Sequence, residues 1–158
     1  DETPRPSEPP RTTAERLAAA KAAYVAARVQ DALVLAADTI VTLDGETLGK
    51  PKDREENVRF LERLAGRTHQ VVTAHALRLG ATQAAATVVT DVTLRPLASS
   101  DIERWVATGR GLDKAGGYAI QDHGAILVAD VRGCYSNVVG LSVPTILRLA
   151  DELGVTLV

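Results

Sequence analysis

The stretch LVLAADTIVTLDGETLGKPK, residues 33–52, contains a strand and the turn that ends it. Residues 33–43 form a nearly continuous apolar run, which is typical of a strand covered on both faces, and Asp44-Gly45 is a strong signal for a hairpin turn. One ionisable side chain, Asp38, interrupts the apolar run. A buried carboxylate is costly unless it has a hydrogen-bond donor, a cation or a metal as its partner. The partner of Asp38 is therefore the first question that the sequence raises.

Two kinds of partner are available to Asp38. For an isolated aspartate, capping of a neighbouring loop is the simplest role. The chain also has lysines in segments where ordinary packing gives no reason for one, and Asp113 adjoins the last of them: Lys21, Lys50, Lys52 and Lys114. A carboxylate with several lysines suits hydrolysis of a phosphoanhydride, because lysines neutralise phosphate oxygens, a divalent metal bridges charges, and a carboxylate activates water.

The composition is that of an ordinary globular domain. The 158 residues are 46% hydrophobic and 24% charged, which favours a single domain with its own core. The net charge of −2 gives no basic surface for nucleic acid or for an anionic membrane, and no apolar stretch is long enough to span a bilayer. We therefore expect a cytoplasmic protein whose partner is a small molecule and not a nucleic acid polymer or a membrane.

The remaining patterns predict an α/β fold with helices packed on a mixed sheet. Expected helix starts are Thr12, Asp53 and Ser100, each with a glutamate three residues later as the partner in a capping box. The expected helices cover residues 12–29, 53–66, 100–108 and 144–154; the further strands cover 68–80, 82–97 and 125–131, of which the first two form an antiparallel pair. Residues 132–140 are expected to be a polar turn.

The loop at residues 109–124, GRGLDKAGGYAIQDHG, is the second candidate for chemistry. Gly116 and Gly117 allow the backbone to approach a ligand closely, although the pattern is not that of a P-loop. Tyr118 offers an aromatic face, and the Gln121 amide can recognise the edge of a base. The alternative is a tight structural turn with Tyr118 packed in the core.

Other reactive side chains give weaker signals. His69, His75 and His123 lack the spacing of zinc ligands. Cys134, the only cysteine, is expected to be a buried or half-buried thiol, and Trp105 is expected to pack its helix against the sheet.

Five segments together resemble the Maf family of nucleoside triphosphate pyrophosphatases in their order and approximate spacing. They are AADTIV (36–41), LGKP (48–51), LAGRTHQVVT (64–73), LDKAGGYAIQ (112–121) and YSNVVGL (135–141). The resemblance extends from about Asp1 to Val155. It implies an α/β fold similar to that of inosine triphosphatase, with a mixed twisted sheet, flanking helices and a cleft between two lobes. It also suggests a homodimer.

The resemblance implies roles for the candidate residues. Asp38 would be the proton acceptor that activates water, and the lysines that match family lysines of the phosphate site are Lys21, Lys50 and Lys114. Such enzymes cleave between the α and β phosphates with a divalent metal, Mg²⁺ or Mn²⁺. Glu2, which matches a family acidic pair, is the expected metal or water contact, and Asp113 is a second candidate.

Thr39 and Gln121 resemble the branch of the family that acts on dTTP and UTP. The Gln121 amide can both donate to and accept from a uracil or thymine edge. We therefore expect a house-cleaning enzyme for dTTP, UTP and modified pyrimidine nucleotides. Two alternatives remain: a 7-methyl-GTP pyrophosphatase, whose branch has different residues at both positions, and a non-catalytic nucleotide-binding regulator of cell division and septum formation.

The chain departs from the family pattern in two places. Family members begin with a strand and a SASPRR-like loop whose Ser and Arg contact the nucleotide, so we expect residues 1–158 to be a single catalytic domain without that segment. A molecule that truly lacks it should be a weak enzyme, whereas a molecule that has it ahead of the printed sequence should be fully active. The family's Thr-Gly is Thr73-Ala74 here, followed by His75. The extra methyl group could narrow the cleft or have no effect.

Overall fold

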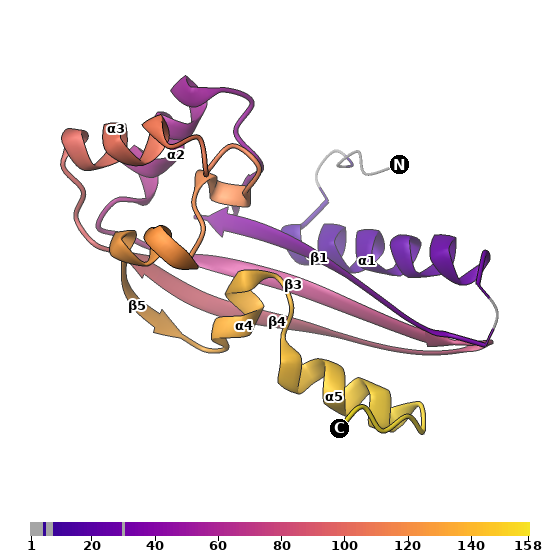
Figure 1. Ribbon diagram of the computed structural model, residues 1–158. Helices are drawn as coiled ribbons and strands as arrows, with labels where there is room; N and C mark the ends of the chain where they lie inside the picture. Colours follow the sequence, from indigo (N-terminus) through magenta and orange to yellow (C-terminus); the bar gives the residue numbers. More distant parts are fainter. Residues whose placement is uncertain (1–4, 6–7, 30) are drawn as a thin grey trace.

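The computed structural model describes residue 5, residues 8–29 and residues 31–158. Figure 1 shows a long twisted sheet with helices along both faces and a cluster of helices at one end. The strands are β1 (Leu33–Leu43), β2 (Glu46–Leu48), β3 (Thr68–Leu79), β4 (Thr82–Leu94) and β5 (Val128–Arg132). The α-helices are α1 (Pro10–Ala26), α2 (Arg54–Leu64), α3 (Ser99–Ala107), α4 (Tyr135–Val139) and α5 (Val143–Glu152), and the 3₁₀ helices are η1 (Ala115–Gly117) and η2 (Asp122–Leu127).

The described strands form one sheet in the order β2-β1-β3-β4-β5. Each neighbouring pair is antiparallel. Tight turns join β1 to β2 and β3 to β4, as expected for antiparallel hairpins, whereas longer segments connect the other two pairs. The α/β class and the antiparallel pairing of β3 with β4 are confirmed. The mixture of strand directions expected from the sequence is not found among the described strands.

The hairpin between β1 and β2 forms at the predicted turn. Asp44 and Gly45 both have positive φ angles, 54° and 82°, as the two central residues of a type I′ hairpin turn require. Because β2 has only three residues, it pairs with residues 41–43 of β1 and leaves residues 33–40 without a partner strand on that side among the described residues. We call residues 33–40 of β1 the open edge of the sheet that the described residues form.

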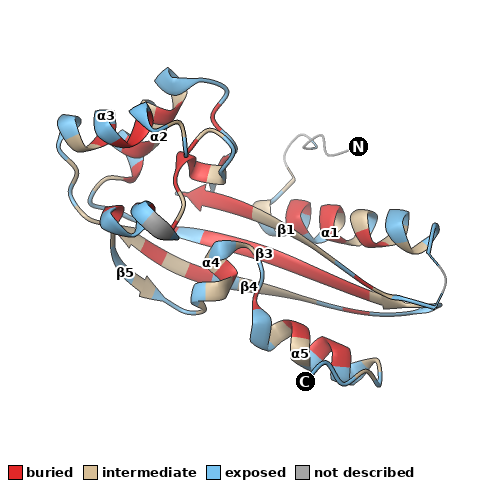
Figure 2. Ribbon diagram, in the orientation of Figure 1, coloured by how far each residue is buried: buried red, intermediate tan, exposed pale blue. Residues whose placement is uncertain are grey.

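Helices α1 and α5 cover opposite faces of the sheet. Successive side chains of a strand point to opposite faces, and the two helices pack against alternate side chains of β3. Small side chains of α1, including Ala14, Ala18 and Ala22, pack on the face that carries Ala74 and Ala76 of β3. Leu149 and Ala150 of α5 pack against Leu77 on the other face. Figure 2 shows the buried stripes of both helices turned toward the strands.

Helices α2 and α3 form a separate group over the end of the sheet where β2 lies. The largest hydrophobic core of the described residues is there, and it includes Leu61, Leu64 and Trp105 together with Val71 and Leu94. The expected packing of Trp105 is confirmed, since it is buried in this core. None of the helices in the described part of the chain is long and apolar enough to cross a membrane.

The helix starts were predicted with mixed success. The cap at Asp53 is confirmed, because its carboxylate accepts a hydrogen bond from the Glu56 amide at 2.8 Å. The expectation that Thr12 caps α1 is wrong, since the helix begins at Pro10 after Pro9. Proline suits the first position of a helix, because the N–H that it lacks would have no partner there.

The third helix also begins differently from the prediction. It starts at Ser99, with Ala98 in the cap position, instead of at Ser100. Asp101 has the role expected of Glu103, because its carboxylate accepts from the Ala98 amide at 3.2 Å. Two more differences lie after the 3₁₀ helix η2. The strand expected at residues 125–131 is β5, which begins at Val128, and the segment 132–140, expected to be a polar turn, contains the short helix α4.

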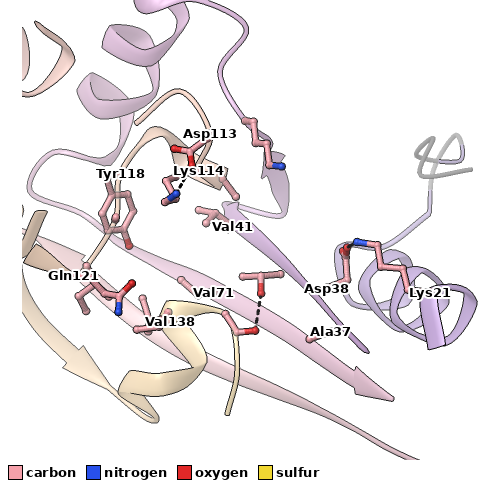
Figure 3. Close-up of a pocket in the computed structure, with 17 residues that line it drawn as sticks. Lys21, Ala37, Asp38, Val41, Val71, Asp113, Lys114, Tyr118, Gln121 and Val138 are labelled. Carbon is pink, nitrogen blue, oxygen red and sulfur yellow. Dashed lines mark hydrogen bonds and ion pairs between the residues drawn. The ribbon is translucent and has the colours of Figure 1, made fainter. Parts of the chain in front are cut away.

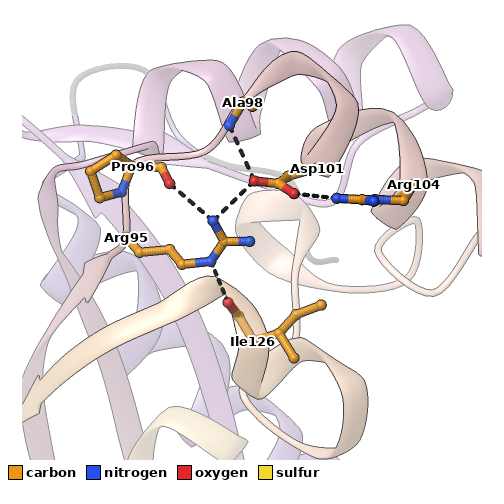
Figure 4. Close-up of polar contacts among 6 residues, drawn as sticks. All are labelled: Arg95, Pro96, Ala98, Asp101, Arg104 and Ile126. Atoms are coloured by element: carbon orange, nitrogen blue, oxygen red, sulfur yellow. Dashed lines mark hydrogen bonds and ion pairs between the residues drawn. The ribbon is translucent and has the colours of Figure 1, made fainter.

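Asp101 is the centre of a polar cluster that joins α3 to the sheet (Figure 4). The Arg95 guanidinium donates to Asp101 at 2.9 Å, and Arg104 donates to its other oxygen at 2.5 Å. Arg95 also donates to the carbonyl oxygens of Ile126 and Pro96. The hydrogen bonds from Arg95 and then Arg104 are the main causes that lower the pKa of Asp101 from 3.8 to about 2.

The glycine loop is anchored through Gly117. Its carbonyl oxygen accepts from the Asn57 side chain at 2.8 Å and from the Trp105 indole at 2.9 Å. The Gly116 amide donates to the Gly49 carbonyl at 3.0 Å. Two buried hydrogen bonds therefore tie this loop to α2 and α3, and a backbone hydrogen bond ties it to the segment after β2.

We expect Asp101→Asn to lower the melting temperature at pH 7, because the amide keeps the shape of the cap but loses the charge that pairs with two arginines. A depressed pKa stabilises the fold above the unfolded value of 3.8 and loses that effect as the pH falls toward about 2. Thermal unfolding at several pH values should therefore show the difference from wild type shrinking below about pH 4. Asp151→Asn is the control, since Asp151 is an exposed aspartate with no ion pair among the described residues. A difference that stays constant down to pH 2 would contradict the proposed origin.

We expect Gly117→Ala to lower the free energy of unfolding by about 2 to 5 kcal/mol. Its φ angle is 77°, and an added Cβ would lie 2.1 Å from the Asn57 side-chain nitrogen. Gly80→Ala is the matched control, because Gly80 has a φ angle of 58° but open space around it. The control should lose only about 1 to 2 kcal/mol in urea unfolding. Equal losses in both variants would show that packing around Gly117 is unimportant.

Candidate active site

A cavity of about 350 Å³ lies beside the open edge of β1. Its lining comes from α1, β1, the segment after β2, β3, the glycine loop at residues 109–124, α4 and the adjoining Gly140 (Figure 3). Seven predicted site residues line it: Lys21, Asp38, Thr39, Lys50, Asp113, Lys114 and Gln121. Glu2, the remaining candidate, lies outside the described residues. Folding thus brings together side chains that are far apart in the sequence.

Consecutive residues of β1 reach this cavity from opposite faces of the strand. Asp38 faces α1, whereas Thr39 faces the side that carries α4, where its hydroxyl lies 3.5 Å from the Gly140 carbonyl oxygen. Both line one cavity because no described strand covers the edge of β1 beside them. The open edge therefore determines where the cavity lies.

Lys21 of α1 is the partner of Asp38. Its ammonium group lies 2.7 Å from the carboxylate, and the side chains are 37% and 13% exposed, respectively. A pair so close to solvent adds little to stability, so stability alone does not explain the aspartate. Arg16 of the same helix is also near: its pKa is raised mainly by hydrogen bonding to Glu8 and further by the charge of Asp38.

The opposite wall of the cavity is also charged. Lys114 forms an ion pair with Asp113, and this hydrogen bond is the main cause that lowers the pKa of Asp113. The charge of Lys50, which lines the same cavity, lowers the pKa of Asp113 further. Lys52 is exposed and is not part of the lining. Three lysines against two aspartates leave this cavity with a net positive charge at neutral pH, which suits a phosphate chain.

An apolar part of the cavity lies between the glycine loop and α4. Its walls include Val41, Val71 and Val138, and the exposed Gln121 adjoins them (Figure 3). This combination of apolar walls with one amide is the usual surrounding of a heterocyclic ring.

Tyr118 borders the same part of the cavity but belongs to the core. It is 5% exposed, and its hydroxyl lies 2.6 Å from His69 Nε2. Burial lowers the pKa of His69 to about 4 and raises the pKa of Tyr118. The structural alternative for Tyr118 is therefore the better one, because its hydroxyl already has a buried partner.

Sequence reasoning missed the contribution of α4. Val138, Val139 and Gly140 line the cavity, although residues 132–140 were expected to be only a turn. Their signal was present in the YSNVVGL segment, which supported the resemblance but was given no role. A helix of five residues is too short to show a helical periodicity in the sequence.

The question about Ala74 is answered by its position. Its side chain is 2% exposed and packs among the alanines of α1, on the face away from Thr39. Ala74 is not part of the cavity lining. The extra methyl group therefore does not narrow this cavity.

The carboxylates present suit a metal that is shared with a substrate. Among the described residues, no group of three or more His, Cys, Asp or Glu side chains is close enough to hold a metal ion. Asp38 and Asp113 both line the cavity. Mg²⁺ is commonly bound by one or two carboxylates together with substrate phosphates and water, and two carboxylates in a cavity that three lysines also line fit that arrangement.

Comparison with known proteins gives a consistent result. The family model described as "Maf-like protein" matches residues 1–153. A dTTP/UTP pyrophosphatase of Myxococcus xanthus is 47% identical over 157 residues, which are 99% of this chain and 80% of the relative. The enzyme of the same name from Pyrococcus furiosus is 46% identical over 92% of this chain and 76% of its own length. That of Aromatoleum aromaticum is 40% identical over 98% of this chain and 77% of its own. The match over nearly the whole sequence shows that this chain belongs to the Maf family.

Proposed function

We propose that this chain is a nucleoside triphosphate pyrophosphatase that hydrolyses dTTP and UTP to the monophosphate and pyrophosphate. Modified pyrimidine nucleotides are included in the proposed substrate class. The observation that carries the proposal is the convergence of Asp38 with Lys21, Lys50 and Lys114 in one cavity. The printed activity of the relatives supports the choice of substrates.

In the proposed reaction, the lysines hold the triphosphate and Asp38 activates water. The carboxylate accepts a proton from the water as the oxygen attacks the α-phosphorus. The bond between that phosphorus and the oxygen that bridges to the β-phosphate breaks, and pyrophosphate leaves with the bonding electrons. Lys21, which holds the Asp38 carboxylate at 2.7 Å, keeps it at the edge of the cavity. Lys50 and Lys114 neutralise charge on the phosphate oxygens and on the leaving group.

A divalent cation, Mg²⁺ or Mn²⁺, is proposed to be shared by the phosphates and by Asp38 or Asp113. When bound, such an ion supplies positive charge that polarises the phosphate oxygens. Glu2 remains a further proposed contact, from the family resemblance alone. In this scheme the protein side chains bind and orient the nucleotide, and Asp38 accepts the proton from water.

The base is proposed to lie between Val71 and Val138, with Gln121 and Thr39 as its polar contacts. A primary amide both donates and accepts, as the edge of uracil or thymine requires. The homodimer stays a prediction from the resemblance, and the cytoplasmic location and the single domain stay predictions from the composition and length of the sequence.

The direct test is release of pyrophosphate from dTTP, UTP and 7-methyl-GTP with Mg²⁺ or Mn²⁺. It should be run on the chain as printed and on the complete product of its gene, because the matched region is 76–80% of the length of these relatives. Turnover of dTTP and UTP by the complete product supports the proposal. A preference for 7-methyl-GTP would contradict the proposed substrates and favour a 7-methyl-GTP pyrophosphatase. Nucleotide binding without turnover would favour a non-catalytic regulator.

Asp38→Asn should lower kcat by about 10²- to 10⁴-fold, because the amide keeps the shape but cannot accept the proton. The readout is the rate of pyrophosphate release at saturating UTP, with a melting curve to show that the variant is folded. Since the ion pair with Lys21 is partly exposed, its loss should change the stability by only about 1 kcal/mol or less. Unchanged kcat in a folded variant would remove Asp38 from the proposed role.

Lys50→Gln should lower kcat/KM for UTP by about ten- to a hundredfold, because a charged hydrogen bond to phosphate is lost. Lys52→Gln is the matched control: it removes the same charge two residues away, from a side chain outside the cavity lining. Steady-state kinetics at fixed ionic strength should separate the two. A similar loss in both variants would indicate a general effect of charge instead of a phosphate contact at Lys50.

A further inference from the structure

The hydroxyl of Thr73 links Thr39 to the backbone of α4. Thr73 is 0% exposed and lies directly opposite Thr39 in the ladder between β1 and β3. Its oxygen is 3.0 Å from the Thr39 hydroxyl oxygen and 3.1 Å from the Asn137 carbonyl oxygen. No residue of this group has a role in the proposed reaction except Thr39.

The direction of these hydrogen bonds follows from counting protons. A hydroxyl group has one hydrogen, and a carbonyl oxygen can only accept. Thr73 must therefore donate to Asn137 if the contact at 3.1 Å is a hydrogen bond. The contact between the two hydroxyl groups then needs the hydrogen of Thr39. The only other acceptor near Thr39 within the described residues is the Gly140 carbonyl at 3.5 Å, and donation there uses the same hydrogen.

The acceptor that sets this direction is held firmly. The side-chain amide nitrogen of Asn137 donates to the Val71 backbone carbonyl at 3.1 Å and to the Thr90 hydroxyl at 3.0 Å. The Asn137 carbonyl also accepts from the Gly140 amide at 3.0 Å. Because Thr73, Thr90 and Asn137 are all fully buried, water does not compete for these bonds.

We propose that Thr73 is a positioning residue that makes the Thr39 hydroxyl an acceptor toward the cavity, and that this favours pyrimidines whose ring N3 carries a hydrogen. Thr39 lies beside the apolar part of the cavity and near α4, whereas Lys21 reaches Asp38 from the other face of β1. Uracil and thymine present N3–H there. Cytosine presents a lone pair at N3, which would oppose the lone pairs of Thr39.

This inference rests on the proposed function, because it assumes a pyrimidine nucleotide in the cavity. Thr73→Val is the decisive variant, since valine keeps the shape but has no hydroxyl. The Asn137 backbone carbonyl still accepts from the Gly140 amide in this variant, so the substitution does not leave that carbonyl without a partner. The Gly140 carbonyl, at 3.5 Å, is then the remaining described acceptor for the hydrogen of Thr39. Because that contact is longer than the lost one at 3.0 Å, a ligand competes for the hydrogen more easily, and discrimination against cytosine should weaken. Thr73→Ser retains the hydroxyl and is the matched control.

The test is calorimetric binding of the α,β-imido analogues of UTP and CTP, in which the bond between the α and β phosphates resists hydrolysis. We expect the wild type to favour the uridine analogue, Thr73→Val to reduce the affinity ratio about tenfold, and Thr73→Ser to keep it. Thr39→Val should reduce the same affinity ratio by a similar factor. The double variant, with valine at both positions, should reduce it no further than Thr39→Val alone.

The outcomes distinguish this inference from the proposed function. An unchanged ratio in folded Thr73→Val, or an equal loss in Thr73→Ser, would overturn the role of Thr73 even if the wild type hydrolyses UTP. The expected pattern of ratios without any pyrophosphate release would support Thr73 and overturn the catalytic proposal. Absence of a preference for the uridine analogue in the wild type would overturn the inference.

Discussion

The pairing of β1 with β3 is the constraint on which the site depends. Ten register pairs, from Leu33 with Leu79 to Thr42 with Gln70, determine which side chain of β1 faces which layer. A shift by one residue would move every side chain to the other face. Asp38 would then lose its place beside α1, and Thr39 would lose its place opposite Thr73. The register thus sets both the charged and the apolar parts of the cavity.

The cavity separates the residues that meet a ligand from those that hold its walls. Lys50, Lys114 and Asp113 are exposed, so their charges have little desolvation cost before a phosphate binds. The groups that anchor the walls are neutral and fully or nearly fully buried: Asn57, Trp105, Thr73, Thr90 and Asn137. Buried hydrogen bonds between neutral groups provide rigidity without isolating a charge from water. This arrangement gives buried, hydrogen-bonded walls around exposed lysines.

Much of the fold could be predicted from local patterns. The apolar run at residues 33–43, the turn at Asp44-Gly45 and the long pair β3–β4 are confirmed. The wrong predictions concern elements that are very short or whose ends depend on several competing contacts. α3 begins at Ser99 because Asp101 caps the helix and also contacts Arg95 and Arg104. Arg95 lies outside the helix, so a local pattern does not reveal this contact. α4 is too short to be recognised from periodicity.

The sequence by itself determined the residue types of the site, the order of the family segments and the α/β class. These depend on local composition and on motifs that survive without knowledge of contacts. Only the tertiary structure decided that Lys21 is the partner of Asp38, that Tyr118 serves the core and that Ala74 packs beneath α1. It also decided that Val138–Gly140 form a wall and that the Thr39 hydroxyl faces Thr73. The physical reason is that such contacts join residues distant in the chain, and their geometry depends on strand register and helix packing instead of on local preference.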